Sequence, residues 1–147
     1  MTTVMSDGET LYPLEVVLQG TPVTLQSRNA PRREAWKNQV MEATRYRQLE
    51  TYELGLLDDR AVAVTIYYFP SAPMDGDIDN IVKLILDGMR GIAYLDDRAV
   101  ERVSVQKFEP DAGWEFETPT DRLALALDTA APVVYLRVDD DLSWRRV

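Results

Sequence analysis

The chain has 147 residues, of which 46% are hydrophobic, and its formal net charge is −9; residues 1–147 are therefore expected to form a single domain. It contains no cysteine and no histidine, which excludes disulfides, thiolate catalysis and histidine-bound zinc and leaves oxygen-bound hard cations as the expected metals. No apolar run is long enough to span a membrane and nothing at the N-terminus resembles a signal peptide, so a cytoplasmic location is expected.

The first third of the chain predicts a strand and a helix. Residues 1–12 are polar and are expected to form a flexible leader. Residues 14–18 (Leu-Glu-Val-Val-Leu) favour a strand, and Pro31 suits the first turn of a helix running to about Arg47. Trp36 on this helix is expected in the core, with stacking on a nucleic-acid base as the alternative.

Positive charge is concentrated in residues 28–47. This stretch holds six basic and two acidic residues, a net charge of +4, which leaves −13 for the rest of the chain. A polyanion is therefore expected to meet this part of the surface. A solvated loop arginine is an equally good interpretation of Arg28. The candidate DNA-binding side chains of this stretch are Arg28, Arg32, Arg33 and Lys37.

A predicted central strand leads into a group of aspartates. Residues 61–69 (Ala-Val-Ala-Val-Thr-Ile-Tyr-Tyr-Phe) are nearly all apolar or β-branched, which is typical of a strand buried on both faces or at a dimer seam. Like charges packed closely cost stability unless a cation joins them. The acids that follow this strand are Asp75, Asp77 and Asp79.

An amphipathic helix is predicted from Asn80, ending at Gly91. Either Asp77 or Asp79 is expected to cap its N-terminus by accepting backbone N–H bonds. The apolar face is formed by Ile81, Leu84, Ile85, Gly88 and Met89, and the polar face by Asn80, Lys83, Asp87 and Arg90.

A second acidic pair, Asp96-Asp97, follows this helix. If the chain brings Asp97 back beside Asp77 and Asp79, three carboxylates converge on one hard cation. Mg²⁺, with Mn²⁺ as a substitute, takes oxygen ligands and keeps several waters. Such a metal lowers the pKa of a bound water and shields charge on a phosphoryl group. With Lys83 placed to meet a phosphate oxygen, the pattern indicates phosphodiester hydrolysis.

An EF-hand calcium loop is one alternative. Asp75, Asp77 and Asp79 have the alternating spacing of the first ligands in such a loop. That loop requires glycine at its sixth position and glutamate at its twelfth. This chain has Asn80 and Leu86 there, which argues against it.

Two simpler interpretations also remain. In the first, the acids only form a solvated loop and a helix cap. In the second, Lys83 and Asp87, which are four residues apart, form only an ordinary surface ion pair. The pair Asp96-Asp97, placed where the chain would return, favours a metal site over both.

The last third of the chain predicts a strand, a helix and a strand. Residues 100–108 alternate, so one face of that strand is expected to be covered. Lys107 lies on the side of Val103 and Val105, where it either faces the carboxylates or guards a sheet edge. Residues 110–118 are a linker, 119–127 a short helix, 133–138 the last strand and 139–147 a tail. This order predicts an α+β (mixed α/β) layered domain with a four-stranded mixed sheet.

The acidic motif resembles that of the RusA family of Holliday junction resolving endonucleases. The matching positions are Asp77, Asp79, Asn80, Lys83, Asp87, Leu95, Asp96, Asp97, Val100 and Lys107. The resemblance implies a Mg²⁺-dependent homodimer that cuts branched DNA such as a four-way junction by paired nicks in recombination and repair. It also implies that the essential carboxylates are Asp77, Asp79 and Asp97 and that the catalytic lysine is Lys83, supported by Asn80, Asp87 and Asp96. Lys107 joins the DNA-binding candidates.

One departure from the family concerns the segment just before the paired aspartates. The bacteriophage-derived members of the family carry an arginine-rich run there, whereas residues 71–76 read Ser-Ala-Pro-Met-Asp-Gly. Fewer phosphate contacts weaken DNA binding at physiological salt. The metal chemistry is unaffected by this difference, so it bears on junction selectivity and not on nuclease activity. Separately, a metal-stabilised DNA-binding module that keeps the fold without turnover is the alternative to a nuclease.

Overall fold

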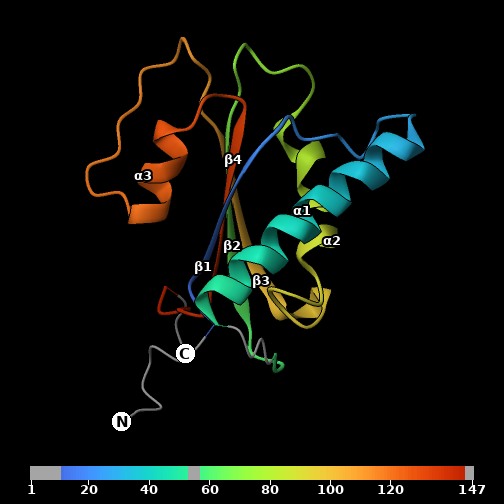
Figure 1. Ribbon diagram of the computed structural model, residues 1–147, viewed down its shortest axis with the longest axis vertical. Helices are drawn as coiled ribbons and strands as arrows, with labels where there is room; N and C mark the ends of the chain where they lie inside the picture. The colour runs from blue at the N-terminus through green and yellow to red at the C-terminus, as the bar shows by residue number, and fades with distance from the viewer. Residues whose placement is uncertain (1–10, 53–56, 145–147) are drawn as a thin grey trace.

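The four strands form one mixed sheet. In this computed structural model, which describes residues 11–52 and 57–144, the strands are β1 (Leu14–Gln19), β2 (Val62–Phe69), β3 (Val100–Lys107) and β4 (Val133–Asp139). Their order is β1-β4-β2-β3 (Figure 1). Strand β2 pairs parallel with β3 and antiparallel with β4, and β1 pairs antiparallel with β4. The predicted four-stranded mixed sheet, with residues 61–69 as a central strand, is confirmed.

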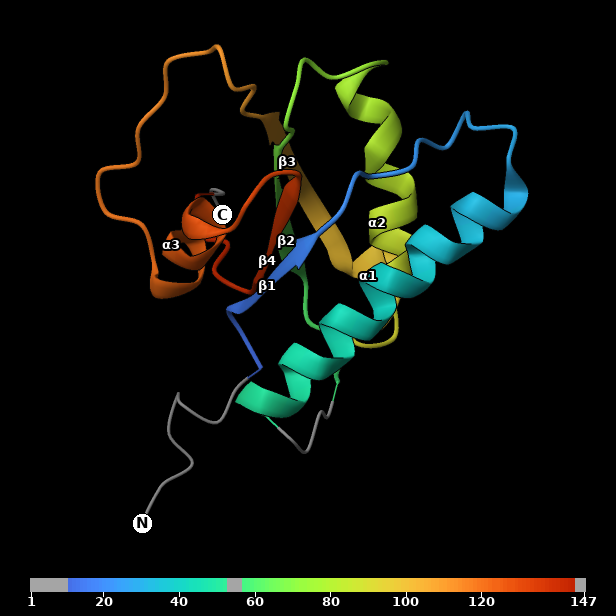
Figure 2. The ribbon, with the colours of Figure 1, turned by 45° about the horizontal axis from the view of Figure 1, so that its top comes forward.

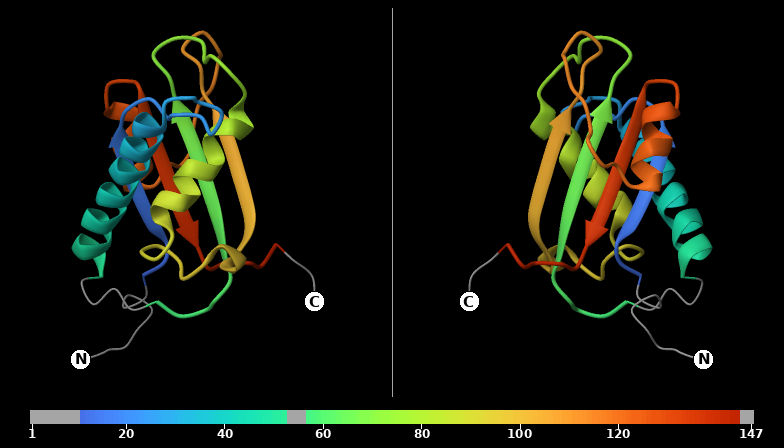
Figure 3. Two further views of the ribbon diagram at one scale, coloured as in Figure 1. Left: turned by 90° about the vertical axis from the view of Figure 1, so that its right-hand side faces the viewer. Right: turned by 90° about the vertical axis from the view of Figure 1, so that its left-hand side faces the viewer.

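Helices cover both faces of the sheet. Helices α1 (Ala30–Thr51) and α2 (Val82–Met89) lie on one face, and α3 (Asp121–Asp128) lies on the other (Figure 3). A 3-10 turn, η2 (Ile78–Ile81), leads into α2, and a second one, η3 (Asp97–Ala99), precedes β3. The predicted α+β class follows from these layers. None of the helices in residues 11–52 and 57–144 is long and apolar enough to cross a membrane.

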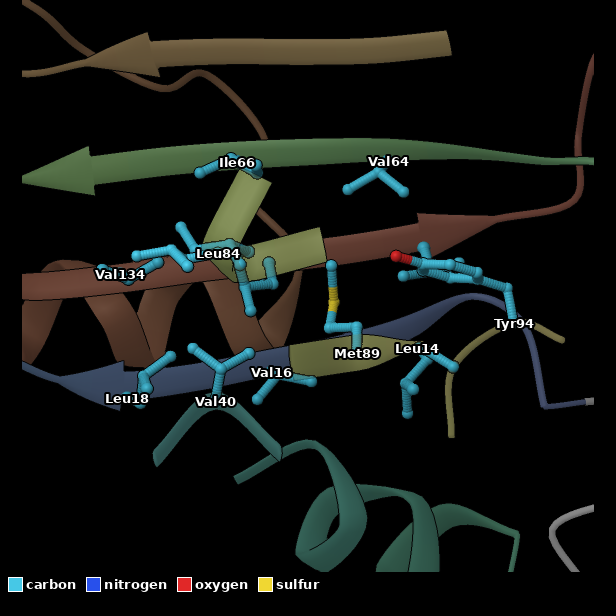
Figure 4. Close-up of a cluster of buried hydrophobic side chains, with 14 of the residues drawn as sticks. Leu14, Val16, Leu18, Val40, Val64, Ile66, Leu84, Met89, Tyr94 and Val134 are labelled. Atoms are coloured by element: carbon cyan, nitrogen blue, oxygen red, sulfur yellow. The ribbon is translucent and has the colours of Figure 1, made fainter. Parts of the chain in front are cut away.

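The main core lies between the sheet and the α1–α2 layer. Alternate strand residues point toward it because side chains along a strand alternate between faces. Trp36 of α1 is 1% exposed, so its predicted place in the core is confirmed. Figure 4 shows the buried side chains meeting from strands and helices, among them Leu14, Val16, Val40, Val64, Ile66, Leu84 and Met89.

A smaller core lies under α3. Phe69, Phe108 and Tyr135 of the sheet side meet Leu123 and Ala126 of the helix. The side-chain oxygen of Thr120 accepts a hydrogen bond from the backbone N–H of Leu123 at 3.1 Å. Thr120 is thus the N-cap of α3, and the predicted short helix is confirmed.

Several element boundaries and exposures differ from the predictions. Helix α1 continues past Arg47 to Thr51, because its buried residues recur every four positions as far as Gln48. Strand β3 lies at a sheet edge, so Val103 on its helix-side face is still 37% exposed.

The predicted leader and tail are partly packed. Leu11 is 4% exposed, and the Tyr12 hydroxyl donates to the backbone oxygen of Ala93 at 2.7 Å. Residues 1–10 of the predicted leader lie outside the described residues. In the predicted tail, Asp139 ends β4 and the ring of Trp144 lies 5.2 Å from the Arg102 guanidinium carbon; residues 145–147 are outside the described part.

Candidate active site

The chain leaves β2 through an acidic turn, defined here as residues 70–79. Gly76 in this turn has a φ of +81°, a backbone conformation that costs glycine little. Asp77 occupies the N-cap position of η2, but its side chain makes no capping hydrogen bond. The N-cap of α2 is Ile81, and it too has no side-chain capping hydrogen bond. The prediction that Asp77 or Asp79 caps the helix by accepting backbone N–H bonds is therefore wrong, although Asp77 does occupy an N-cap position. Asp77 is exposed.

The acidic turn is anchored on its helix side. The backbone N–H of Leu25 donates to the backbone oxygen of Asn80 at 2.9 Å, which joins the loop before α1 to η2. Asp79 is exposed like Asp77. Among the residues that the structure describes, neither carboxylate has a side-chain hydrogen bond or ion pair. Both are therefore available to an incoming ligand.

Helix α2 carries the predicted polar face. Its apolar residues Leu84, Ile85, Gly88 and Met89 are buried, which leaves Lys83 outside, 52% exposed. The Lys83 Nζ lies 3.0 Å from Asp87 Oδ1. The surface ion pair that the spacing allowed is therefore present.

Asp97 lies beside this polar face. Its Oδ2 atom is 3.8 Å from Lys83 Nζ and 3.3 Å from Arg90 Nη1. The turn is held by Asp96, whose side-chain oxygen accepts a hydrogen bond from the backbone N–H of Asp97 at 2.7 Å. Lys83 of α2 and Arg90 at its C-cap thus both contact the carboxylate of Asp97.

The electrostatics of Lys83 define what it can do chemically. Its hydrogen bond to Asp87, with the charge of Asp87 and more weakly that of Asp97, raises the pKa of the lysine. A raised lysine pKa favours the charged ammonium form at neutral pH.

The three candidate metal ligands do not meet within one chain. Figure 2 shows the acidic turn at one end of α2 and the turn before η3 at the other end. Helix α2 has eight residues and by itself spans roughly 12 Å. Ligand oxygens lie only about 2 Å from a Mg²⁺ ion. Within residues 11–52 and 57–144, no three acidic side chains lie close enough to hold a metal, which also argues against the EF-hand interpretation.

The donor chemistry nevertheless suits a hard cation. Asp77, Asp79 and Asp97 offer carboxylate oxygens alone, and the chain has no histidine or cysteine. Such ligands favour Mg²⁺ or Mn²⁺ over zinc. The residue types present therefore fit such a metal. Within a single chain, however, they form two separate groups: Asp77 and Asp79 form one, and Asp97 stands by itself.

A comparison with protein families identifies the family to which this chain belongs. A model of the family described as endodeoxyribonuclease RusA matches residues 20–115, well over half of the chain. The chain belongs to the RusA family. It is accordingly an endonuclease of the Holliday junction resolvase type, acting in DNA recombination. No curated protein sequence matches the chain.

The RusA match includes the basic stretch of residues 28–47. Arg28 is exposed in the loop before α1. Arg32 lines a cleft of about 420 Å³ between the loop that holds Pro22 and the acidic turn. Arg33 donates to the backbone oxygen of Ser27. Lys37 lies 3.4 Å from Glu34. Arg32 is thus one of the predicted cations that lie beside the acidic turn.

Lys107 of this RusA-family chain reaches the same end of the sheet. It pairs with Tyr68 in the β2–β3 register, as Val105 pairs with Ile66, so the predicted side is confirmed. Its Nζ lies 3.0 Å from Glu109 Oε2, and the same oxygen accepts a hydrogen bond from the backbone N–H of Met74 at 2.8 Å. Lys107 therefore contacts the acidic turn through Glu109.

Two residues of the site were not predicted from the sequence. Glu109 had no assigned role because nothing local to it signals a contact 35 positions away. Arg90 was placed on the polar face of its helix, but its contact with Asp97 depends on where the following turn folds back.

Glu109→Ala is expected to loosen the acidic turn, because alanine has no side-chain oxygen to accept the Met74 N–H. The hydrogen bond from Met74, and then the one from Lys107, lower the pKa of Glu109, so the contact is present above the ordinary carboxyl range and is lost as pH falls through the lowered pKa. Hydrogen exchange at the Met74 amide is expected to accelerate in the variant at neutral pH. Asp111→Ala, at a neighbouring exposed acid, is the control, and equal exchange in wild type and Glu109→Ala would contradict the anchoring role.

Proposed function

We propose that this RusA-family chain is a Mg²⁺-dependent endodeoxyribonuclease that resolves four-way junctions and related branched DNA by paired nicks as a homodimer. Mn²⁺ is a suitable substitute. The observation that carries the proposal is the division of the family's acidic motif. Asp77 and Asp79 are exposed before α2, and Asp97 lies beside Lys83 and Arg90 after it.

A second copy of the chain completes the metal site in this proposal. Because α2 separates the two groups of carboxylates, Asp97 of one copy joins Asp77 and Asp79 of the other. Paired nicking follows from such an arrangement, since a two-fold dimer carries two identical sites. The exposure of all three carboxylates is compatible with this pairing.

Each residue then has a defined role. Asp77, Asp79 and Asp97 hold the metal, which when bound lowers the pKa of a water and shields the charge of the scissile phosphate. Lys83 stays protonated and holds a phosphate oxygen. Asp87 positions the Lys83 ammonium through their 3.0 Å contact.

Two further residues hold the backbone of the site. Asn80 joins η2 to the loop before α1 through its backbone oxygen. Asp96 accepts the Asp97 backbone N–H and so shapes the turn that presents Asp97. The proposed DNA contacts are Arg28, Arg32, Arg33, Lys37 and Lys107.

A nicking assay tests the proposed function. Labelled four-way junction, flap and plain duplex are incubated with the protein in Mg²⁺, in Mn²⁺ and in chelator. The expected result is metal-dependent paired nicks in the junction and little cleavage of duplex. The absence of any cut branched substrate in either metal would contradict the proposal and leave a metal-stabilised binding module, whose melting temperature rises with metal.

Lys83→Ala separates catalysis from metal binding. The variant is expected to lose nicking by about 100-fold or more, since a lost positioned cation removes transition-state stabilisation. Metal affinity measured by calorimetry is expected to stay near the wild-type value or to increase. Full nicking by Lys83→Ala would show that the lysine is only a surface partner of Asp87.

A further inference from the structure

Arg90 is the closer of the two cations on Asp97. Its Nη1 lies 3.3 Å from Asp97 Oδ2, and the Lys83 Nζ lies 3.8 Å from the same oxygen. Lys83 has a nearer partner in Asp87, at 3.0 Å. Within the described residues, Arg90 has no ion pair other than Asp97. Among the described residues, Asp97 is therefore the one acidic partner of Arg90.

The contact is exposed and easily exchanged. Both Arg90 and Asp97 are 49% exposed at the side chain. Exposed ion pairs of this kind contribute little net free energy, because water screens them and both side chains lose freedom. Arg90 lies at the C-cap of α2, so its side chain can leave Asp97 without disturbing the buried face of the helix.

We propose that Arg90 is a resident counter-cation of Asp97 that gives way to the divalent metal and then contacts a DNA phosphate. This inference rests on the proposed function, because it takes Asp97 as a metal ligand. A metal that replaces Arg90 on Asp97 releases the guanidinium at the edge of the same site. Arginine matches phosphate geometry with two parallel donors.

The exchange couples metal binding to DNA binding. In the absence of metal, Arg90 neutralises Asp97 and opposes a dication there. With metal bound, the same side chain adds one phosphate contact. Two ligands that compete for or release one side chain must affect each other's affinity reciprocally.

Calorimetric titration with Ca²⁺ in the absence of DNA tests the first half. Arg90→Gln is expected to bind Ca²⁺ about fivefold to tenfold more tightly, the effect of removing one charge near a dication in a largely aqueous setting. Arg90→Lys, which keeps the charge, is expected to stay near wild type. The matched control is Arg98→Gln, since Arg98 is 91% exposed and lies 4.0 Å from Asp96; it is expected to change the affinity less than twofold.

The salt dependence of four-way junction binding tests the second half. In Ca²⁺, after a check that no nicks form, Arg90→Gln is expected to flatten the plot of log affinity against log salt by about 0.9. In chelator the slope is expected to match wild type, because Arg90 then remains on Asp97. An equal slope change with and without Ca²⁺ would overturn the exchange.

Further outcomes separate this inference from the proposed function. If wild type binds Ca²⁺, Asp97→Asn weakens that binding and Arg90→Gln does not strengthen it, the counter-cation role is overturned and the metal site stands. The same conclusion follows if Arg98→Gln strengthens binding as much as Arg90→Gln. If wild type binds no Ca²⁺, both the role of Arg90 and the proposed metal site are overturned.

Discussion

Asp97→Asn is expected to abolish nicking of a four-way junction while the fold persists. Asparagine keeps the shape of the side chain but removes the charge that a hard cation requires. The loss is expected to exceed about 100-fold, since even changes to groups that only orient a metal ligand cost up to that much. Product gels in Mg²⁺ measure the rate, and melting temperature checks the fold. Asp111→Asn, on an exposed loop outside the site, is expected to nick normally.

Mixing two inactive variants shows where the ligands come from. Asp77→Asn and Asp97→Asn chains, refolded together, form mixed dimers. If Asp97 of one copy works with Asp77 of the other, each mixed dimer has one intact site and produces single nicks. If all ligands come from one chain, no mixed dimer has an intact site. A fully inactive mixture with confirmed mixed dimers would contradict the shared site.

Gly88→Ala is expected to destabilise the chain, although alanine is the better helix former. A Cβ at position 88 would lie 2.7 Å from the Val40 Cβ and 2.9 Å from the backbone oxygen of Lys37. The backbone of α1 cannot move away as a flexible side-chain tip would. Overpacking of this kind costs about 1 to 3 kcal/mol, more than the gain of about 0.5 to 1 kcal/mol from replacing a helical glycine. Denaturant unfolding measures the difference.

The matched control for this substitution is Gly113→Ala, at a position with no atom within 4 Å of the added Cβ. It is expected to change the unfolding free energy by less than about 0.5 kcal/mol. The double variant Val40→Ala with Gly88→Ala is expected to cost less than the sum of the two single changes, because Val40→Ala removes the Cγ1 atom that lies 2.8 Å from the new methyl group, while the Cβ of residue 40 remains. A stabilised Gly88→Ala protein would show that helix propensity outweighs the α1–α2 contact.

Residue patterns in the sequence determine much of the fold. The nearly continuous apolar run of residues 61–69 predicts a central strand, and the helical spacing of Leu84, Ile85, Gly88 and Met89 predicts a buried face; the structure has both. Burial of both strand faces is only partly present, since most alternate residues of β2 are half-buried. Such predictions succeed because the face that a side chain occupies depends on local backbone geometry. The short helix predicted over residues 119–127 also depends on local sequence, because its Thr120 cap contacts a backbone N–H only three residues away.

The acidic motif is likewise a property of the sequence. The types and spacing of Asp77, Asp79, Lys83 and Asp97 indicate a family and a class of chemistry, and the match over residues 20–115 bears out the family. The exposed state of the Asp77 carboxylate differed from the predicted cap. Capping depends on the direction in which the acidic turn enters the helix, and that direction follows from contacts with the rest of the chain.

The amino-acid sequence by itself thus determined which residue types are available, which faces are apolar and which family the chain joins. Tertiary structure decided how far Asp79 lies from Asp97, which cation rests on Asp97 and how closely Gly88 approaches Val40. These are distances between segments, and they depend on how α2 packs against α1 and the sheet. No local pattern encodes that packing, because it is the joint result of side chains far apart in the chain.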